Sequence, residues 1–288
     1  MRSLLFVPGD DAHKLAKAMA SGADALILDL EDSVAPAGKA PARQLLRDVI
    51  FDARRQNPRP RLFVRINGLG TGLAGLDLDA IMPAGPDGIV LPKSRSGADV
   101  QHLGAKLAVR EAENGLPDGA CAIIPIVTET AASLFGLASY AGSSQRLLGM
   151  AWGAEDLSAA LGAQTNRLPD GAFTAPYQLA RTLTLVGARA AEVEPIDTVF
   201  TAFRDMDGLR RDCEAARRDG FTAKMAIHPA QVPVINEVFT PSLEALARAQ
   251  AIVAAFAENP EVGVIALGEE MLERTHLLRA RGVLARAR

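Results

Sequence analysis

Short apolar runs alternate with longer amphipathic segments along most of the chain. Eight runs have the length and continuous apolar character of buried strands, at residues 4–7, 25–30, 62–66, 88–91, 122–127, 146–151, 193–199 and 224–227. Most are separated by stretches with helical spacing, for example 41–56, 98–114, 177–186 and 208–219. This alternation is typical of βα units in a parallel sheet. Strands that are apolar at every position indicate burial on both faces.

The number of these units predicts the fold class. Eight βα units within residues 1–228 fit a (β/α)8 TIM barrel, an α/β fold of about 250 residues. After residue 228 the pattern changes. Residues 231–258 contain two helical patterns separated by Thr240-Pro241-Ser242, and 268–288 also has helical character. We therefore expect a TIM-barrel catalytic domain over 1–228 and a C-terminal helical extension over 229–288.

Composition and charge narrow the class of protein. Of the 288 residues, 49% are hydrophobic and 23% are charged, which favours a packed globular protein over a disordered chain. The net charge of −3 gives no basic surface for nucleic acid, so we expect no nucleic-acid partner. Two cysteines cannot build a disulfide framework. The apolar run at residues 4–7 is too short for a secretory signal, and no stretch is long enough to span a membrane, so we expect a cytoplasmic protein.

Polar residues follow the predicted strands at the positions where barrel active sites are built. The active sites of such barrels lie at the C-terminal ends of the strands. The polar residues at these ends are Asp29, Glu31, Asp32, Arg65, Asn67, Lys93, Thr128, Glu129, Glu155, Asp156, Asp197 and His228. Carboxylates dominate this set, and two cations face them. Such a composition suits a site that binds a divalent metal ion and an organic anion.

Glu129 and Asp156 are the best candidates for metal ligands. Each follows a predicted strand directly, and the ends of neighbouring barrel strands lie close together. Oxygen ligands without a histidine or cysteine cluster suit Mg²⁺, which takes one or two carboxylates and leaves its other positions to water and substrate. The competing interpretation of Asp156 is a charge in the first turn of a helix.

Arg65 needs a partner because it lies in an otherwise apolar strand, and an unpaired buried guanidinium is costly. An ion pair with Glu31 or Asp32 would satisfy it. A substrate carboxylate held in a bidentate fork is the alternative, and both can hold at once.

Seven segments together resemble one known family. They read RSLLFVPGD, GADALILDLEDSV, VRIN, GIVLPK, IVTET, WGAEDLSAALG and GFTAKMAIHPAQV, and in this order they span residues 2 to about 241. The chain thereby resembles the HpcH/HpaI aldolase and citrate lyase β-subunit-like family. The resemblance implies a (β/α)8 barrel with a C-terminal helical segment, in homo-oligomers that are most often trimers or hexamers. It also implies a Mg²⁺-dependent lyase that cleaves or forms the C–C bond of a β-hydroxyacyl-CoA thioester, such as citramalyl-, malyl- or citryl-CoA, with acetyl-CoA and a 2-oxoacid as products.

The resemblance assigns roles to individual residues of the barrel. The family's metal ligands fall on Glu129 and Asp156, and its substrate-binding arginine falls on Arg65. The positions on the CoA side fall near Phe6, Lys17 and the backbone of residues 226–227.

The remaining assignments concern the proton that the reaction moves. Glu31 and Asp32 match the acidic motif after the second strand. In the CoA lyases, a C-terminal lid from a neighbouring subunit supplies an aspartate, and the corresponding stretch here, 270–276, carries Glu273. We expect Asp32, or Glu273 of a neighbouring subunit, to transfer the proton.

Other functions remain open on the same barrel. The chain could act as a thioesterase that releases a free acid from a malyl-CoA-like substrate. It could also be a subunit that works on an acyl-carrier-protein thioester within a larger lyase complex, or a non-catalytic paralogue that stabilises one. A pyruvate aldolase that acts without CoA matches the quoted motifs less well.

Overall fold

Eight parallel strands form one continuous sheet in the computed structural model, which describes residues 1–287. The strands are β1 (Ser3–Pro8), β2 (Ala25–Asp29), β3 (Arg61–Arg65), β4 (Gly88–Leu91), β5 (Ala122–Pro125), β6 (Gly149–Ala151), β7 (Glu194–Asp197) and β8 (Ala223–Ala226). Their spatial order is β5-β4-β3-β2-β1-β8-β7-β6. Parallel bridges between Ile123 and Leu147 and between Ile126 and Ala151 join the two outermost strands. The predicted barrel is thereby confirmed.

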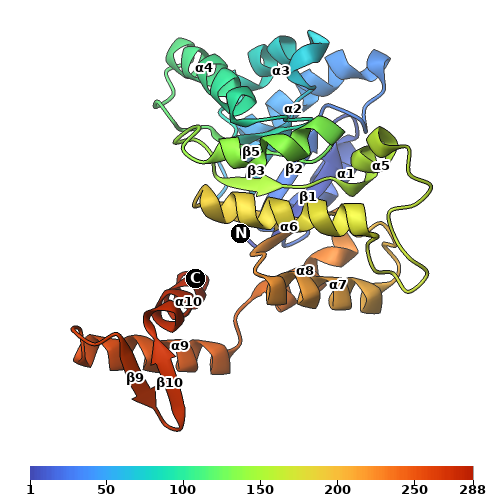
Figure 1. The fold of residues 1–288 in the computed structure, drawn as a ribbon. Helices are drawn as coiled ribbons and strands as arrows, with labels where there is room; N and C mark the ends of the chain where they lie inside the picture. Colours follow the sequence, from blue (N-terminus) through green and yellow to red (C-terminus); the bar gives the residue numbers. More distant parts are fainter. Residues whose placement is uncertain (288) are drawn as a thin grey trace. The chain divides into compact units, whose positions relative to one another are not determined.

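Helices lie outside the strands, as Figure 1 shows. They are α1 (Ala12–Met19), α2 (Lys39–Ala53), α3 (Ala74–Ile81), α4 (Gly97–Glu113), α5 (Ala154–Leu161), α6 (Ala175–Ala190), α7 (Met206–Asp219) and α8 (Val232–Phe239). Short 3-10 helices are η1 (Pro36–Gly38), η2 (Leu69–Thr71), η3 (Met82–Ala84), η4 (Ala131–Tyr140) and η5 (Pro229–Gln231). Most helices turn an apolar stripe inward. In α2, for example, Ala42, Leu46, Ile50 and Ala53 are buried, which is the spacing of one helical face.

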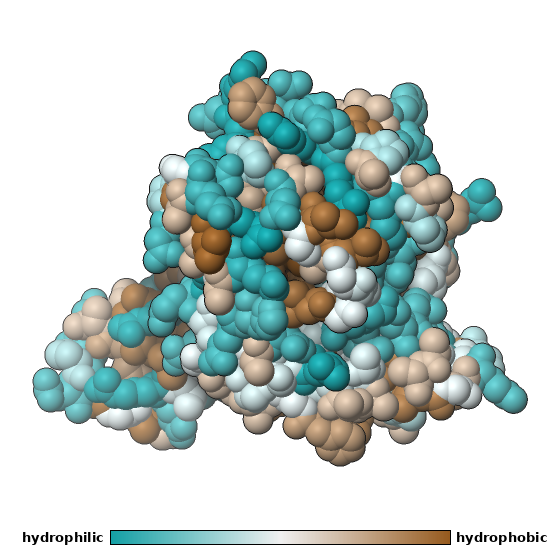
Figure 2. Space-filling view, turned by 90° about the horizontal axis from the view of Figure 1, so that it is seen from above, coloured by the Kyte–Doolittle hydropathy of each residue, from teal (hydrophilic) through white to brown (hydrophobic). Residues whose placement is uncertain are grey.

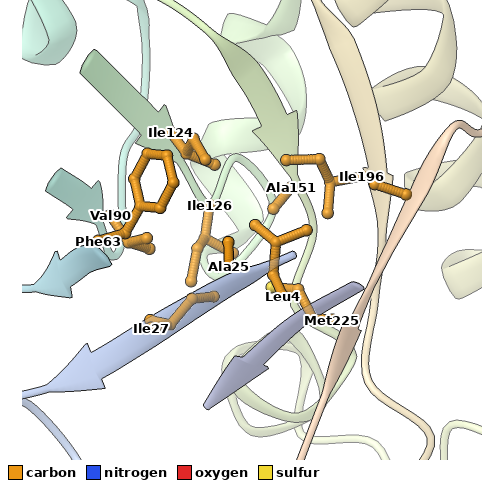
Figure 3. Close-up of a cluster of buried hydrophobic side chains, with 11 residues drawn as sticks. Leu4, Ala25, Ile27, Phe63, Val90, Ile124, Ile126, Ala151, Ile196 and Met225 are labelled. Carbon is orange, nitrogen blue, oxygen red and sulfur yellow. The ribbon is translucent and has the colours of Figure 1, made fainter. Parts of the chain in front are cut away.

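The inside of the barrel is filled with apolar side chains. Those of Leu4, Ala25, Ile27, Phe63, Val90, Ile124, Ile126, Ala151, Ile196, Ala223 and Met225 form one buried cluster, most of which Figure 3 labels. They come from all eight strands or from the residue that directly follows one. This packed core holds the strand ends in fixed positions, so polar residues that follow the strands have a rigid support.

The chain divides into two compact units, Met1–Asn236 and Glu237–Arg288. The barrel unit thus continues past the expected boundary at residue 228. Part of α8 belongs to it, because the side chain of Asn236 accepts a hydrogen bond from Ser3 Oγ at 2.7 Å and donates one to Gly22 O at 2.9 Å. No helix among the described residues is both long and apolar enough to cross a membrane.

The second unit differs from the expected purely helical extension. It contains α9 (Leu243–Glu258), a hairpin of β9 (Val264–Leu267) and β10 (Glu270–Glu273), and α10 (Arg274–Ala285). The helical interpretation of 268–288 was wrong over β10, because the strands alternate in burial and Gly268 makes the turn at φ +62°. Ile265 and Leu272 point into a small core shared with α9 and α10.

Candidate functional site

A cavity of about 320 Å³ opens at the C-terminal ends of the barrel strands. Its wall consists of Phe6, Val7, Pro8, Asp29, Ser33, Arg65, Ile126, Glu129, Gly153, Ala154, Glu155, Asp156, Thr198, Val199, Met225 and Ile227. The face in Figure 2 is hollowed near its centre, and hydrophobic side chains gather there within a hydrophilic surround. A cavity of this size with a few converging polar groups is the usual form of a small-molecule site.

The two predicted metal ligands lie in the same cavity wall. Glu129 follows β5 and is only 4% exposed, while Asp156 stands in the first turn of α5, where the helix dipole favours a negative charge. Gly153, the N-cap of α5, leaves room for the glutamate. A Cβ at this position would lie 2.9 Å from Glu129 Cγ, which is closer than carbon atoms pack. The absence of a side chain at 153 therefore lets Glu129 pass the start of α5.

The electrostatics around Glu129 favour a bound cation. Burial raises the pKa of Glu129 to about 8, and the negative charges of Asp156 and Glu31 add to the shift. The backbone N–H of Lys93 donates a hydrogen bond to the Glu129 carboxylate and acts in the opposite direction. The positive charge of Arg65 also lowers the pKa of Glu129, and a cation bound beside this carboxylate would favour its charged form further.

The donor set fits Mg²⁺. Among residues 1–287, no group of three or more His, Cys, Asp and Glu side chains forms a closed metal cage. Mg²⁺ does not need one, because it commonly binds one or two carboxylates and keeps its remaining positions for water and an anionic ligand. Glu129 and Asp156, at the wall of an open cavity, provide such an incomplete set.

The main partner of Arg65 is Asp29, which differs from the expectation. Arg65 Nε and Nη2 donate to the two carboxylate oxygens of Asp29 at 2.7 and 2.6 Å. Glu31 lies 3.2 Å from Nη1, as a second ion-pair partner, whereas Asp32 pairs with Lys93. The bidentate fork is thus occupied by protein, so a substrate carboxylate would have to use what remains of the guanidinium.

Lys93 is a second cation that contacts the carboxylates at this end of the barrel. Its Nζ lies 2.6 Å from Glu31, 3.4 Å from Asp32 and 3.6 Å from Asp156. Glu31 is buried and its pKa is raised by that burial, whereas the Asp32 side chain is 55% exposed. Among the described residues, neither Glu31 nor Asp32 belongs to the cavity wall. Lys93 contacts both carboxylates, and Arg65, which does line the wall, contacts Glu31.

The positions assigned to the CoA side lie apart from each other. Phe6, within β1, lines the cavity and places its ring centroid 4.9 Å from Arg65 Cζ, in a cation–π contact. Ile227, after β8, lines the cavity as well. Lys17 stands on the exposed side of α1, in its last turn, and is not among the described residues of the cavity wall.

Glu273 belongs to the second compact unit. It ends β10 and is the N-cap of α10, where its backbone N–H donates to His276 Nδ1 at 3.0 Å. Its side chain is exposed within that unit.

The sequence places Asp29 and Lys93 among the polar residues at the strand ends, but it assigns no specific role to either. A signal for Asp29 existed, because it closes a strand in which every residue is buried and shares its register position with Arg65. Two opposite charges at the last positions of neighbouring buried strands are expected to pair. For Lys93 the backbone conformation matters, and the sequence gives no sign of it.

A second buried charge network supports the strands next to the site. Lys224 Nζ on β8 is fully buried and lies 2.8 Å from Asp197 and 2.7 Å from Asp212. Asp197 also accepts a hydrogen bond from Trp152 Nε1 at 2.8 Å. Trp152, the single tryptophan, directly precedes Gly153 and the start of α5. The network therefore fixes the segment that leads to Asp156.

Comparison with known proteins places the chain in a family. A family model described as HpcH/HpaI aldolase/citrate lyase matches residues 2–229. A (3S)-malyl-CoA thioesterase of Cereibacter sphaeroides is 37% identical, over 99% of this chain and 94% of its own length. The citrate lyase subunit beta of Leuconostoc mesenteroides is 34% identical, over 98% and 92%.

A solved structure shares the fold over the full length. The protein CitE from Mycobacterium tuberculosis, in complex with magnesium, acetoacetate and coenzyme A, aligns with a TM-score of 0.78 at 35% identity, covering 99% of this chain and 97% of that one. Together with the family model over the barrel, this similarity extends through both compact units. The chain belongs to the HpcH/HpaI aldolase/citrate lyase family.

Proposed function

We propose that this protein is a Mg²⁺-dependent carbon–carbon lyase that cleaves or forms a β-hydroxyacyl-CoA thioester, such as citramalyl-, malyl- or citryl-CoA, with acetyl-CoA and a 2-oxoacid as the other partners. The observation that carries the proposal is the convergence of Glu129, Asp156 and Arg65 on one cavity at the strand ends. Family membership supports it, as does the similar protein whose structure holds magnesium, acetoacetate and coenzyme A.

Glu129 and Asp156 would hold the metal ion. When bound, Mg²⁺ supplies positive charge to the hydroxyl and carboxylate oxygens of the substrate's 2-hydroxyacid part, which lowers the pKa of that hydroxyl. Glu129 provides a carboxylate fixed by burial and by the Lys93 N–H, and Asp156 provides one fixed by the start of α5. Their rigid support keeps the 2-oxoacid end of the substrate at one place in the cavity.

Arg65 would stabilise the thioester enolate that forms as the C–C bond breaks. Its guanidinium lines the cavity and is held in place by Asp29 and by the ring of Phe6. A preorganised positive charge at the oxygen where negative charge develops is a large contribution to catalysis. Burial lowers the pKa of Arg65, but the hydrogen bond and charge of Asp29 outweigh this effect and raise it, so the group stays charged.

A carboxylate must move the proton between the hydroxyl and the enolate carbon. We assign this role to Asp32, or to Glu273 brought by the C-terminal unit of a neighbouring subunit. Comparison of Asp32→Asn with Glu273→Gln separates the two assignments, because only the acting residue lowers kcat strongly when it loses its charge. Phe6 and Lys17 are assigned to the CoA side.

We further propose that the protein works as a homo-oligomer, a trimer or hexamer, in the cytoplasm. Both cysteines, Cys121 and Cys213, are free and buried, which suits a reducing compartment. The similarity to a citrate lyase subunit beta supports the alternative that an acyl carrier protein presents the thioester within a larger complex.

The test is a substrate panel with separate quantification of the products. Purified protein is incubated with citramalyl-, malyl- or citryl-CoA, with and without Mg²⁺. A lyase produces acetyl-CoA and a 2-oxoacid in equal amounts. The thioesterase alternative, which the similarity to a (3S)-malyl-CoA thioesterase supports, predicts free CoA and the intact hydroxyacid instead. Activity on carrier-protein thioesters alone would favour the subunit function.

A further inference from the structure

Residue 93 adopts a backbone conformation that non-glycine residues rarely take. Lys93 lies two residues after Leu91, the last residue of β4, and has φ +53°, in the left-handed region. Ser94, the next residue, is buried and shares a hydrogen bond of 2.8 Å with the Tyr140 hydroxyl. The chain on both sides of Lys93 is therefore anchored. Such strained residues persist only where the surroundings determine them, and they cluster at functional sites.

This conformation points two different donors of one residue at the carboxylates of the site. The backbone N–H donates to Glu129, and the ammonium lies 2.6 Å from Glu31 and 3.6 Å from Asp156. Lys93 thereby contacts both proposed metal ligands, one through its backbone and one through its side chain. Burial lowers the pKa of Lys93, but its hydrogen bond to Glu31 and the charges of the carboxylates outweigh this and raise it, so the ammonium stays protonated.

We propose that Lys93 is a positioning residue of the metal site, and that its ammonium shares the carboxylates with the bound metal ion. The inference deepens the proposed function and rests on the metal site assigned there. Around the cavity end, Asp29 is paired with Arg65, and Glu31 is shared by Arg65 and Lys93. The Lys93 ammonium also lies 3.6 Å from Asp156, one of the two proposed metal ligands.

The charge of Lys93 has opposite effects on the binding of a cation and of an anion. The positive charge of Lys93 repels Mg²⁺ but attracts the carboxylate of a 2-oxoacid that binds beside the metal ion. Removal of that charge should therefore tighten the binding of Mg²⁺ and weaken the binding of the anion. If Lys93 had a purely structural role, its replacement would disorder the site, and both Mg²⁺ and the 2-oxoacid would bind more weakly.

The experiment measures binding to the full-length protein by calorimetry, without turnover. Mg²⁺ is titrated first, and pyruvate is then titrated at saturating Mg²⁺. For Lys93→Met, which keeps the backbone N–H on Glu129, we expect Mg²⁺ to bind about tenfold more tightly and pyruvate about tenfold more weakly. Lys93→Arg retains the charge and should bind both ligands as the wild type does. Lys106→Met, a change on α4 outside the site, is the matched control and should also match the wild type.

Two results overturn the inference. In the first, the dissociation constants of Lys93→Met for Mg²⁺ and for pyruvate both stay within about twofold of the wild-type values. In the second, Lys93→Met binds both ligands more weakly than the wild type does. If circular dichroism shows that Lys93→Met does not fold, Lys93→Gln replaces it with the same two expectations. A wild-type protein that binds no Mg²⁺ overturns the proposed metal site, and this inference falls with it. A wild type that binds Mg²⁺ normally while Lys93→Met is indistinguishable from it overturns the inference alone.

Discussion

Arg65 and Asp29 face each other as the last residues of neighbouring strands β3 and β2, and the guanidinium binds both carboxylate oxygens, at 2.7 and 2.6 Å. Both side chains are nearly excluded from solvent. The pair fixes the orientation of Arg65 before any substrate arrives, and the Phe6 ring adds a further contact. The position of the charge that we propose to stabilise the enolate is therefore a property of the folded barrel.

The first prediction concerns Arg65→Lys. An ammonium cannot occupy both oxygens of Asp29 in a planar fork, so the charge near the enolate loses its fixed position. We expect kcat to fall by about 10²- to 10³-fold. Steady-state kinetics with the best CoA thioester measures this, with Mg²⁺ affinity as the control for an intact site. A kcat close to that of the wild type would contradict the role given to Arg65.

The pH dependence of the free energy of unfolding tests the contribution of Asp29 to its ion pair with Arg65. Burial raises the pKa of Asp29, but the hydrogen bond and charge of Arg65 outweigh this and lower it. A lowered folded-state pKa gives stabilisation that is complete above the unfolded value of about 4 and is lost as the pH falls through the folded value. Urea unfolding between pH 7 and 2.5 should therefore show a smaller acid-dependent loss for Asp29→Asn than for the wild type.

The control for this experiment is Asp52→Asn, because Asp52 is an exposed residue near the end of α2. Its unfolding free energy should follow the wild-type pH dependence. At neutral pH, Asp29→Asn itself should be less stable by about 3–5 kcal/mol, since Arg65 is left buried without its main partner. Equal acid dependence in Asp29→Asn and wild type would refute the pairing as a source of stability.

Gly153→Ala tests the space that Glu129 needs. The new Cβ would lie 2.9 Å from Glu129 Cγ, so the glutamate must move out of its place in the cavity wall. We expect Mg²⁺ to bind at least about tenfold more weakly, which corresponds to about 1.4 kcal/mol. Gly75→Ala on α3 is the matched control, because nothing lies within 4 Å of its added Cβ. Unchanged Mg²⁺ affinity in Gly153→Ala would remove Glu129 from the metal site.

The sequence predicts the barrel well for a physical reason. Strands buried on both faces, such as β2 and β4, need apolar residues at every position and stand out in the sequence. The hairpin of β9 and β10 was missed because its strands are four residues long and mostly exposed, which leaves only a weak alternation.

The sequence likewise predicts some residues of the site and misses others. Strand ends identify Glu129, Asp156 and Arg65, and the structure brings all three to one cavity. The choice of Asp29 as the partner of Arg65 depends on the register between two strands, which only the folded sheet supplies. The left-handed conformation of Lys93 depends on anchors on both sides, so no local pattern predicts it.

Lys224→Met tests the buried network beside α5. The substitution leaves Asp197 and Asp212 without their shared ammonium. Breaking a buried pair in this way should lower the free energy of unfolding by about 3–5 kcal/mol. Trp152 donates to Asp197, so its fluorescence, the only tryptophan signal of the chain, should change as well. A variant with wild-type stability and an unchanged spectrum would show that the network does not hold this segment.

We propose that Glu129 and Asp156 hold the Mg²⁺ on which C–C bond cleavage depends. The most direct test of this proposal measures Mg²⁺-dependent formation of acetyl-CoA from the preferred CoA thioester by Glu129→Ala and Asp156→Ala, with folding checked by circular dichroism. The account predicts that both variants fold and that neither forms acetyl-CoA at any Mg²⁺ concentration that saturates the wild type. Full Mg²⁺-dependent activity in either folded variant would contradict it.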